Sequence, residues 1–145
     1  MEILILDVYP SASYRITKDT NGGYGTSNDY GDGLVATFLK WLVGKSLDWP
    51  PLHAVYTAAV LREQDHSVTY SRELPDGRRY DFVILPSSIV AHETELAAVR
   101  AVRTAGMPAV VTGPFATSRP SPYNDAGAVV ILGEPEMYFA AHGLT

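Results

Sequence analysis

Short apolar runs recur along the chain, separated by longer stretches in which apolar residues return at helical spacing. Four runs are continuously apolar, which is typical of strands buried on both faces of a sheet. They span residues 3–6, 82–85, 109–111 and 128–132. A shorter run at residues 68–70 predicts a strand nearer an edge. The pattern therefore predicts five strands.

Helical patterns fill the intervals between these runs. Pro51 is expected to open a helix, because the first turn does not use the N–H that proline lacks. The apolar stripe predicted for this helix is Leu52, Val55, Tyr56, Ala59 and Val60. A second helix is predicted over 92–105, ending at Gly106. Its apolar positions are Leu96, Val99 and Val102. Pro135 is expected to open the last helix, which continues through Phe139 and Ala141.

Strands that alternate with helices predict parallel βαβ units. The expected fold class is α/β: a doubly wound, Rossmann- or flavodoxin-like open parallel sheet of five strands with helices on both faces. The flavodoxin-like strand order 2-1-3-4-5 suits the length of the chain, although the sequence does not fix that order.

Residues 9–50 form an unusually long connection after the first strand. Residues 34–47 predict an extra helix, with Asp32 as its N-cap and Gly44 near its end. The segment 18–33 contains five glycines among Asn, Asp and Tyr residues and predicts a loop that is costly to order alone. We expect Tyr24, Asn28 and Tyr30 within it to contact a ligand or a partner domain.

Composition narrows the possible functions. The net charge of −5, without a long basic run, disfavours binding to nucleic acid or to a membrane surface. No cysteine is present, so thiolate catalysis and cysteine-held metal sites are excluded on this chain. We predict a cytoplasmic protein, because no signal-peptide pattern precedes the first strand. The chain stops soon after the last helix begins, which suggests a fragment of a larger enzyme.

Ligands of open α/β sheets bind beyond the carboxyl ends of the strands. The segments expected there are 7–11, 86–90, 112–117 and 133–136. They are polar but nearly uncharged, without histidine or lysine, and Glu134 and Glu136 are their only paired carboxylates. This composition favours a large neutral ligand over hydrolysis, and it predicts no catalytic residue and no metal ligand. His53 is the one histidine expected close to this edge.

Competing ligand sites lack residues that they need. A phospho-receiver requires an aspartate where Pro86-Ser87 stands. The nearest match to a dinucleotide motif begins Gly23-Tyr24-Gly25 and is not followed directly by a helix. Ser11 and Ser13 could face a flavin phosphate, but the glycines of a phosphate-wrapping loop are missing.

Several segments in order resemble the cobalamin-binding domain of vitamin-B12-dependent radical-SAM enzymes. They are Pro51 to Glu63 followed by His66-Ser67-Val68, Tyr80-Asp81 before the third strand, Val111 to Thr117, Ala126 to Val130, and Gly133-Glu134-Pro135-Glu136. The resemblance covers roughly residues 51–142. His53 and Asp65 stand where the family commonly has glycine.

The resemblance implies that residues 1–145 form one cobalamin-binding domain. The cofactor-binding residues that it implies, together with the positions at the strand ends, are Tyr9, Pro10, Ser87, Ser88, Ile89, Thr112, Gly113, Pro114, Phe115, Gly133 and Glu134. The wider B12 superfamily has a cobalt-binding histidine after the first strand, where this chain has Tyr9. The implied cofactor is therefore base-off cobalamin without a histidine ligand, its tail passing a slot of small residues at Ser87 and Gly113.

The family also implies a radical-SAM catalytic domain, in cis or in trans, that carries S-adenosylmethionine and a [4Fe-4S] cluster. Its reaction would be methyl transfer, or else a cobalamin-assisted rearrangement. This chain lacks the cysteines for such a cluster and is not expected to be catalytic alone. The alternative is a cofactor-free, flavodoxin-like interaction module whose segment 9–50 docks a partner.

Overall fold

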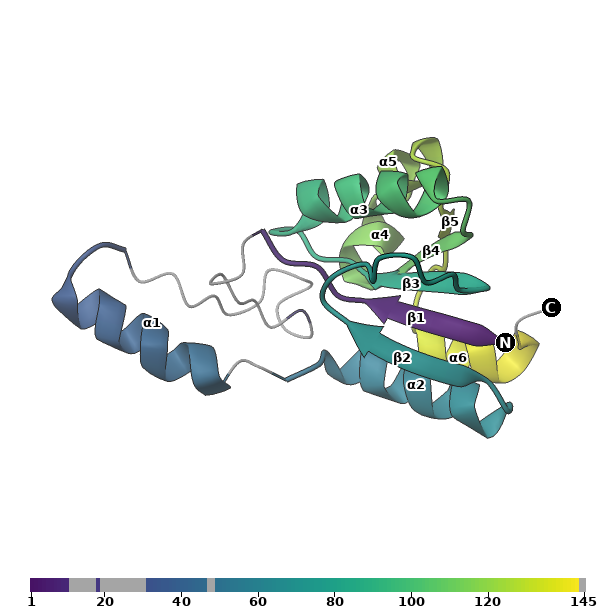
Figure 1. Cartoon of the computed structure of the whole chain (residues 1–145), viewed down its shortest axis with the longest axis horizontal. Helices are drawn as coiled ribbons and strands as arrows, with labels where there is room; N and C mark the ends of the chain where they lie inside the picture. Colours follow the sequence, from purple (N-terminus) through teal and green to yellow (C-terminus); the bar gives the residue numbers. More distant parts are fainter. Residues whose placement is uncertain (11–17, 19–30, 47–48, 144–145) are drawn as a thin grey trace.

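A computed structural model of the chain describes residues 1–10, 18, 31–46 and 49–143 (Figure 1). Five parallel strands form one sheet in the order β2-β1-β3-β4-β5. The strands are β1 (Glu2–Leu6), β2 (Ser67–Ser71), β3 (Phe82–Pro86), β4 (Ala109–Thr112) and β5 (Val129–Val130). The predicted doubly wound fold is confirmed, with flavodoxin-like strand order.

Helices connect the strands. They are α1 (Leu34–Ser46), α2 (Leu52–Glu63), α3 (His92–Thr104), α4 (Pro114–Ser118), α5 (Ser121–Asp125) and α6 (Pro135–His142). The weak run at 68–70 is indeed an edge strand, β2. The other edge strand, β5, is shorter than the run 128–132, because its ladder with β4 pairs only Val129 and Val130.

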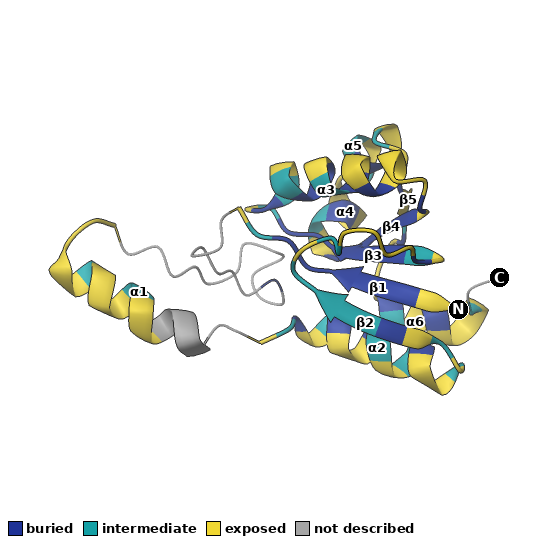
Figure 2. Cartoon of the chain, in the orientation of Figure 1, coloured by how far each residue is buried: buried dark blue, intermediate teal, exposed yellow. Residues whose placement is uncertain are grey.

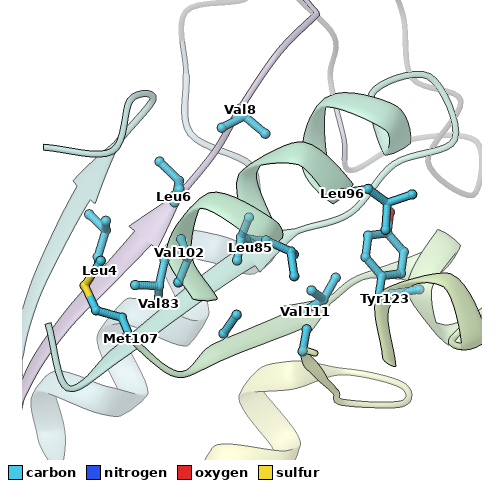
Figure 3. Close-up of a cluster of buried hydrophobic side chains, with 14 of the residues drawn as sticks. Leu4, Leu6, Val8, Val83, Leu85, Leu96, Val102, Met107, Val111 and Tyr123 are labelled. Carbon is cyan, nitrogen blue, oxygen red and sulfur yellow. The ribbon is translucent and has the colours of Figure 1, made fainter. Parts of the chain in front are cut away.

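The alternation of side chains along β1 divides the core between the two faces of the sheet. Leu4 and Leu6 pack with Val83, Leu85 and the helices α3 and α5 on one face (Figure 3). The odd-numbered residues of β1 pack with α2 and α6 on the other face. Both faces are buried, which explains why the strands are continuously apolar.

The predicted apolar face of α3 is confirmed, and its end at Gly106 has the expected left-handed backbone, with φ +75°. Glu95 is buried on the same face, one turn before Val99. A second left-handed residue, Asp65 with φ 60°, follows α2. Asp65 thus occupies a conformation that favours glycine, the residue common there in the resembling family.

The stripe predicted for α2 is wrong. The buried residues of this helix are Ala54, Thr57 and Leu61, whereas four of the five predicted stripe residues are exposed: Leu52, Val55, Tyr56 and Ala59. The helix packs closely against α6, and small side chains on its inner face permit that approach. The larger apolar side chains consequently point outward.

The extra helix predicted after β1 is present as α1. It begins after Gly33, whose carbonyl accepts the Thr37 N–H at 2.8 Å, so the prediction of Asp32 as the N-cap is wrong by one residue. Helix α1 lies apart from the sheet in Figure 1, and the large apolar side chains whose burial the structure describes, between Leu34 and Leu42, are exposed (Figure 2). The predicted contacts of Tyr24, Asn28 and Tyr30 lie outside the described residues.

Candidate functional site

A cavity of about 530 Å³ opens at the carboxyl edge of the sheet. Three helices contribute to it: the start of α2, both ends of short α4 and the start of α6. Its lining residues are Lys18, Leu52, His53, Tyr56, Gly113, Pro114, Thr117, Ser118, Gly133, Glu134, Pro135 and Glu136. Its volume is that of a pocket for a small organic ligand or a part of a larger one.

Four of the residues predicted to bind a cofactor line this cavity: Gly113, Pro114, Gly133 and Glu134. Gly133 is held in place because its N–H donates to the Thr117 hydroxyl at 3.1 Å. The large α2 residues Leu52 and Tyr56, which are not needed for packing, give the cavity an apolar wall. The outward face of α2 is thereby part of the site.

Three of the predicted residues, at the ends of β3 and β4, are deeply buried beneath this edge. Ser87, Ser88 and Thr112 are at most 1% exposed. The Ser87 hydroxyl accepts the Ala116 N–H at 2.9 Å, and the Ser88 hydroxyl donates to Glu95 at 3.1 Å. Both serine hydroxyls therefore hold the turns together in this structure and do not line the cavity.

The remaining predicted residues are Tyr9 and Pro10 after β1, Ile89 after β3 and Phe115 in α4. Pro10 is exposed, while Tyr9, Ile89 and Phe115 are half-buried. His92 connects the latter two, since its Nδ1 lies 2.7 Å from the Ile89 carbonyl oxygen and its ring lies 5.2 Å from that of Phe115. The Tyr9 hydroxyl donates to Asp7 at 2.6 Å.

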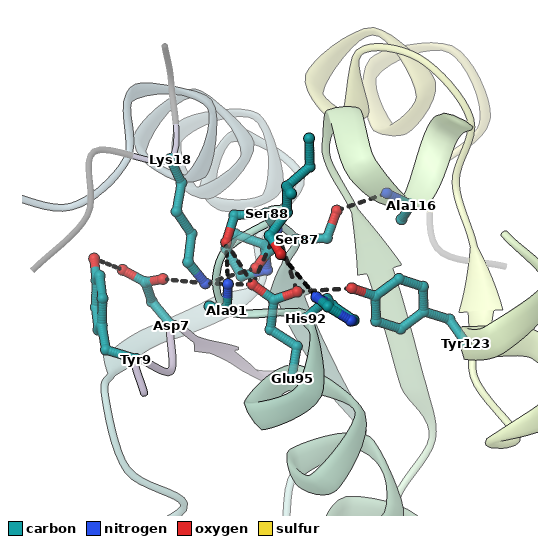
Figure 4. A network of polar contacts seen from close by, with 12 residues as sticks. Asp7, Tyr9, Lys18, Ser87, Ser88, Ala91, His92, Glu95, Ala116 and Tyr123 are labelled. Carbon is teal, nitrogen blue, oxygen red and sulfur yellow. Dashed lines mark hydrogen bonds and ion pairs between the residues drawn. The ribbon is translucent and has the colours of Figure 1, made fainter. Parts of the chain in front are cut away.

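A buried ionic cluster fills the edge between the ends of β1 and β3 (Figure 4). The Lys18 ammonium lies 3.0 Å from a carboxylate oxygen of Asp7 and 3.0 Å from one of Glu95, and all three side chains are fully buried. It also donates to the Pro86 carbonyl oxygen at 2.9 Å. The prediction of a nearly uncharged edge without lysine is therefore wrong, because Lys18 and Glu95 reach it from outside the strand ends.

Hydroxyl groups surround the two carboxylates. Tyr9 and Tyr70 both donate to Asp7, at 2.6 and 2.7 Å, and Tyr123 donates to Glu95 at 2.7 Å. Burial, followed by the charge of the adjacent carboxylate, raises the pKa of each tyrosine above its usual value. These phenols consequently remain protonated hydrogen-bond donors.

The Lys18 ammonium is stabilised by the same carboxylates. Burial alone lowers the pKa of this group, but the charges of Glu95 and Asp7, together with their hydrogen bonds, hold the pKa above its usual value. Lys18 is therefore a buried cation and does not supply a free amine.

Sequence reasoning missed this cluster for two different reasons. Glu95 carried a signal, because a carboxylate one turn before Val99 shares the apolar face of a helix and requires a buried partner there. Lys18 carried none: it follows β1 by twelve residues in a polar stretch, and only the folded chain brings it to the edge.

Among the described residues, two histidines lie near the site. His53 lines the cavity, as its predicted position near the edge suggested, and His92 lies beside Phe115. Among the residues that the structure describes, no group of three or more His, Cys, Asp or Glu side chains is arranged to hold a metal ion. Nor is any helix of that part long and apolar enough to cross a membrane.

The fold and the cavity together define a doubly wound α/β protein with a ligand-sized site at the carboxyl edge of its sheet. The chain matches no protein-family model, no curated protein and no solved structure. The function must therefore be argued from the site itself and from the sequence motifs that surround it.

Proposed function

We propose that this domain binds cobalamin in its base-off form at the carboxyl edge of the sheet. The observation that carries the proposal is the cavity itself, which lies at the edge where doubly wound sheets bind ligands and is lined by Gly113, Pro114, Gly133 and Glu134. The same four residues belong to the segments that resemble cobalamin-binding domains.

The cavity fits one part of this cofactor. Its volume of about 530 Å³ is too small for a whole cobalamin but suits the benzimidazole nucleotide tail. Leu52, Tyr56 and Pro114 offer apolar surface to an aromatic group, while His53 and Thr117 are polar groups of the same cavity. The amide-fringed corrin would then remain outside, above the strand ends.

Tyr9 supports binding without a protein ligand to cobalt. It stands where the wider B12 superfamily has its cobalt-binding histidine. Its hydroxyl donates to Asp7, and burial together with that carboxylate raises its pKa, which disfavours the phenolate that a metal would require. When bound, cobalamin supplies a cobalt centre able to carry a methyl group; the chain supplies the cavity and excludes a competing ligand.

The partner that the resemblance implies is a radical-SAM catalytic domain, in cis or in trans, acting in methyl transfer or a related rearrangement. Such a domain would supply the cysteines for its cluster, which this chain lacks. We accordingly propose a cofactor-carrying role, without catalysis by this domain alone.

The test is an absorption titration of the purified protein with hydroxocobalamin. We expect a stoichiometric complex that survives gel filtration and has the spectrum of base-off cobalamin. A colourless protein after gel filtration, at cobalamin concentrations well above the protein concentration, would overturn the proposal.

The alternative is a cofactor-free interaction module. One observation favours it: α1 exposes Leu34, Val35 and Phe38 by 93%, 74% and 59%, an apolar surface that is unusual for a helix in water. The same titration separates the two functions, since an interaction module leaves the protein colourless and still folded.

A further inference from the structure

Lys18 belongs to two parts of the molecule at once. Its ammonium is the centre of the buried ionic cluster, between Asp7 and Glu95. Yet it is also one of the residues that line the cavity at the carboxyl edge. Its side chain is fully buried and ends between the two carboxylates (Figure 4), so Lys18 borders the cavity through its main chain.

The three groups that accept from the Lys18 ammonium come from separate elements. Asp7 follows β1, the Pro86 carbonyl ends β3, and Glu95 lies in the first turns of α3. These elements meet beside the point where the strand order reverses, between β1 and β3. The lysine therefore fixes one residue of the long connection after β1 against the sheet edge between β1 and β3.

The contacts of the ammonium are difficult to replace by water. A buried cation is tolerated when several acceptors surround it, and Lys18 has three of them at 2.9–3.0 Å. Withdrawal of the lysine would leave two buried carboxylates without a cation. The cluster holds one positive and two negative groups, so its net charge would change from −1 to −2.

We propose that Lys18 is a positioning residue for the ligand cavity: Asp7 and Glu95 hold its ammonium, and this buried anchor keeps the main chain of Lys18 at the wall of the cavity. This inference rests on the proposed function, because it assigns Lys18 to the same cavity. Lys18 does not act as a nucleophile or a base in this role, since the amine stays protonated and enclosed by its acceptors.

The test separates the position of the side chain from its charge. Lys18→Met keeps a long unbranched side chain but removes the ammonium, whereas Lys18→Met/Glu95→Gln also restores the cluster charge to −1. We expect the single variant to lower both the melting temperature and the affinity for hydroxocobalamin, the latter at least tenfold. The double variant should recover most of the lost melting temperature, while its affinity for hydroxocobalamin stays at least fivefold weaker than that of the wild type.

Two outcomes would overturn the inference. One is a double variant that recovers affinity together with stability, because Lys18 would then only neutralise charge. The other is wild-type affinity in Lys18→Met. If the first double variant does not fold, Lys18→Met/Asp7→Asn has the same net charge and tests the same point.

A measurement without cobalamin separates this inference from the proposed function. The rate of Lys18 acetylation by an N-hydroxysuccinimide ester, followed by mass spectrometry, should be at least tenfold lower in the wild type than in Asp7→Asn/Glu95→Gln. Protection of Lys18 without cobalamin binding would overturn the proposed function alone. Equal rates in the two proteins would overturn the role of Lys18, whatever the titration gives.

Discussion

Gly113 and Ser87 are in contact across the carboxyl ends of β4 and β3. A Cβ atom added to Gly113 would lie 3.0 Å from the Ser87 carbonyl oxygen and 3.2 Å from both its nitrogen and its hydroxyl oxygen. Gly113 also has a φ of +103°, a region that other residues rarely adopt. The glycine therefore permits two turns to approach each other, and in this structure the gap between them is closed.

This contact predicts a strong effect of Gly113→Ala on folding. The positive φ and the contact with a backbone oxygen should together lower the free energy of unfolding by about 2–4 kcal/mol. Gly133→Ala is the matched control, since Gly133 also has a positive φ but would have no atom within 4 Å of its Cβ; it should cost about 1 kcal/mol. Urea unfolding measures both, and equal costs would contradict the explanation.

The cavity can be filled from its exposed side. Ser118 lies on its wall at the end of α4, so Ser118→Phe should weaken hydroxocobalamin binding at least tenfold, about 1.4 kcal/mol, with little change in melting temperature. Ser121→Phe places the same ring on exposed α5, away from the cavity, and should bind as the wild type does. Normal binding by Ser118→Phe would show that the ligand lies elsewhere.

The proposed absence of a protein ligand to cobalt has a spectroscopic signature. Paramagnetic resonance of the bound cobalt(II) form should show no nitrogen superhyperfine splitting. His53→Ala is the relevant variant, because His53 is the histidine of the cavity, and it should leave the spectrum unchanged. Triplet splitting in the wild type that disappears in His53→Ala would identify a histidine ligand and exclude the proposed coordination.

The buried cluster predicts a loss of stability in alkaline solution. The pKa values of Lys18, Tyr9, Tyr70 and Tyr123 are all raised in the folded protein, each tyrosine by burial and a neighbouring carboxylate and the lysine by Glu95 and Asp7 against its burial. Above about pH 10 the unfolded chain loses these protons while the folded protein retains them. The free energy of unfolding should thus be unaffected by these groups below pH 10 and fall above it.

Tyr123→Phe isolates one member of this set. Each group contributes a slope of up to about 1.4 kcal/mol per pH unit, so this variant should have a shallower alkaline slope by about that amount. At neutral pH it should be less stable by about 1–3 kcal/mol, since it loses the hydrogen bond to buried Glu95. Chemical denaturation between pH 8 and pH 12 measures both effects, and an unchanged slope would contradict the assignment.

The inward face of α2 predicts a large effect on stability at one position and almost none at the next. Ala54 is buried on the face that packs with α6, so Ala54→Leu should cost about 1–3 kcal/mol through overpacking. Val55 is 46% exposed, and Val55→Ala should change stability by less than about 0.5 kcal/mol. Thermal unfolding of the two variants decides between the observed face and the stripe expected from the sequence.

The sequence alone determined the fold class and most of the elements. Continuous apolar runs at β1, β3 and β4 predict strands buried on both faces, because runs of only a few residues are too short for a buried helix and alternate with longer helical patterns. Proline and glycine signals placed the start of α6 and the end of α3 correctly. Strand exits such as Gly133 and Glu134 also follow from the pattern, since ligand sites lie at the carboxyl ends of parallel strands.

Only the tertiary structure decided which face of α2 is buried and what occupies the edge between β1 and β3. Apolar periodicity selects the larger side chains, but the close approach of α6 requires the smaller ones, so Ala54 and Thr57 point inward. Lys18, Asp7 and Glu95 are separated along the chain by 11 and 77 residues, from which no local pattern predicts an encounter. Burial decides their pairing, because a charge removed from water must find an opposite charge, and the fold alone brings these three together.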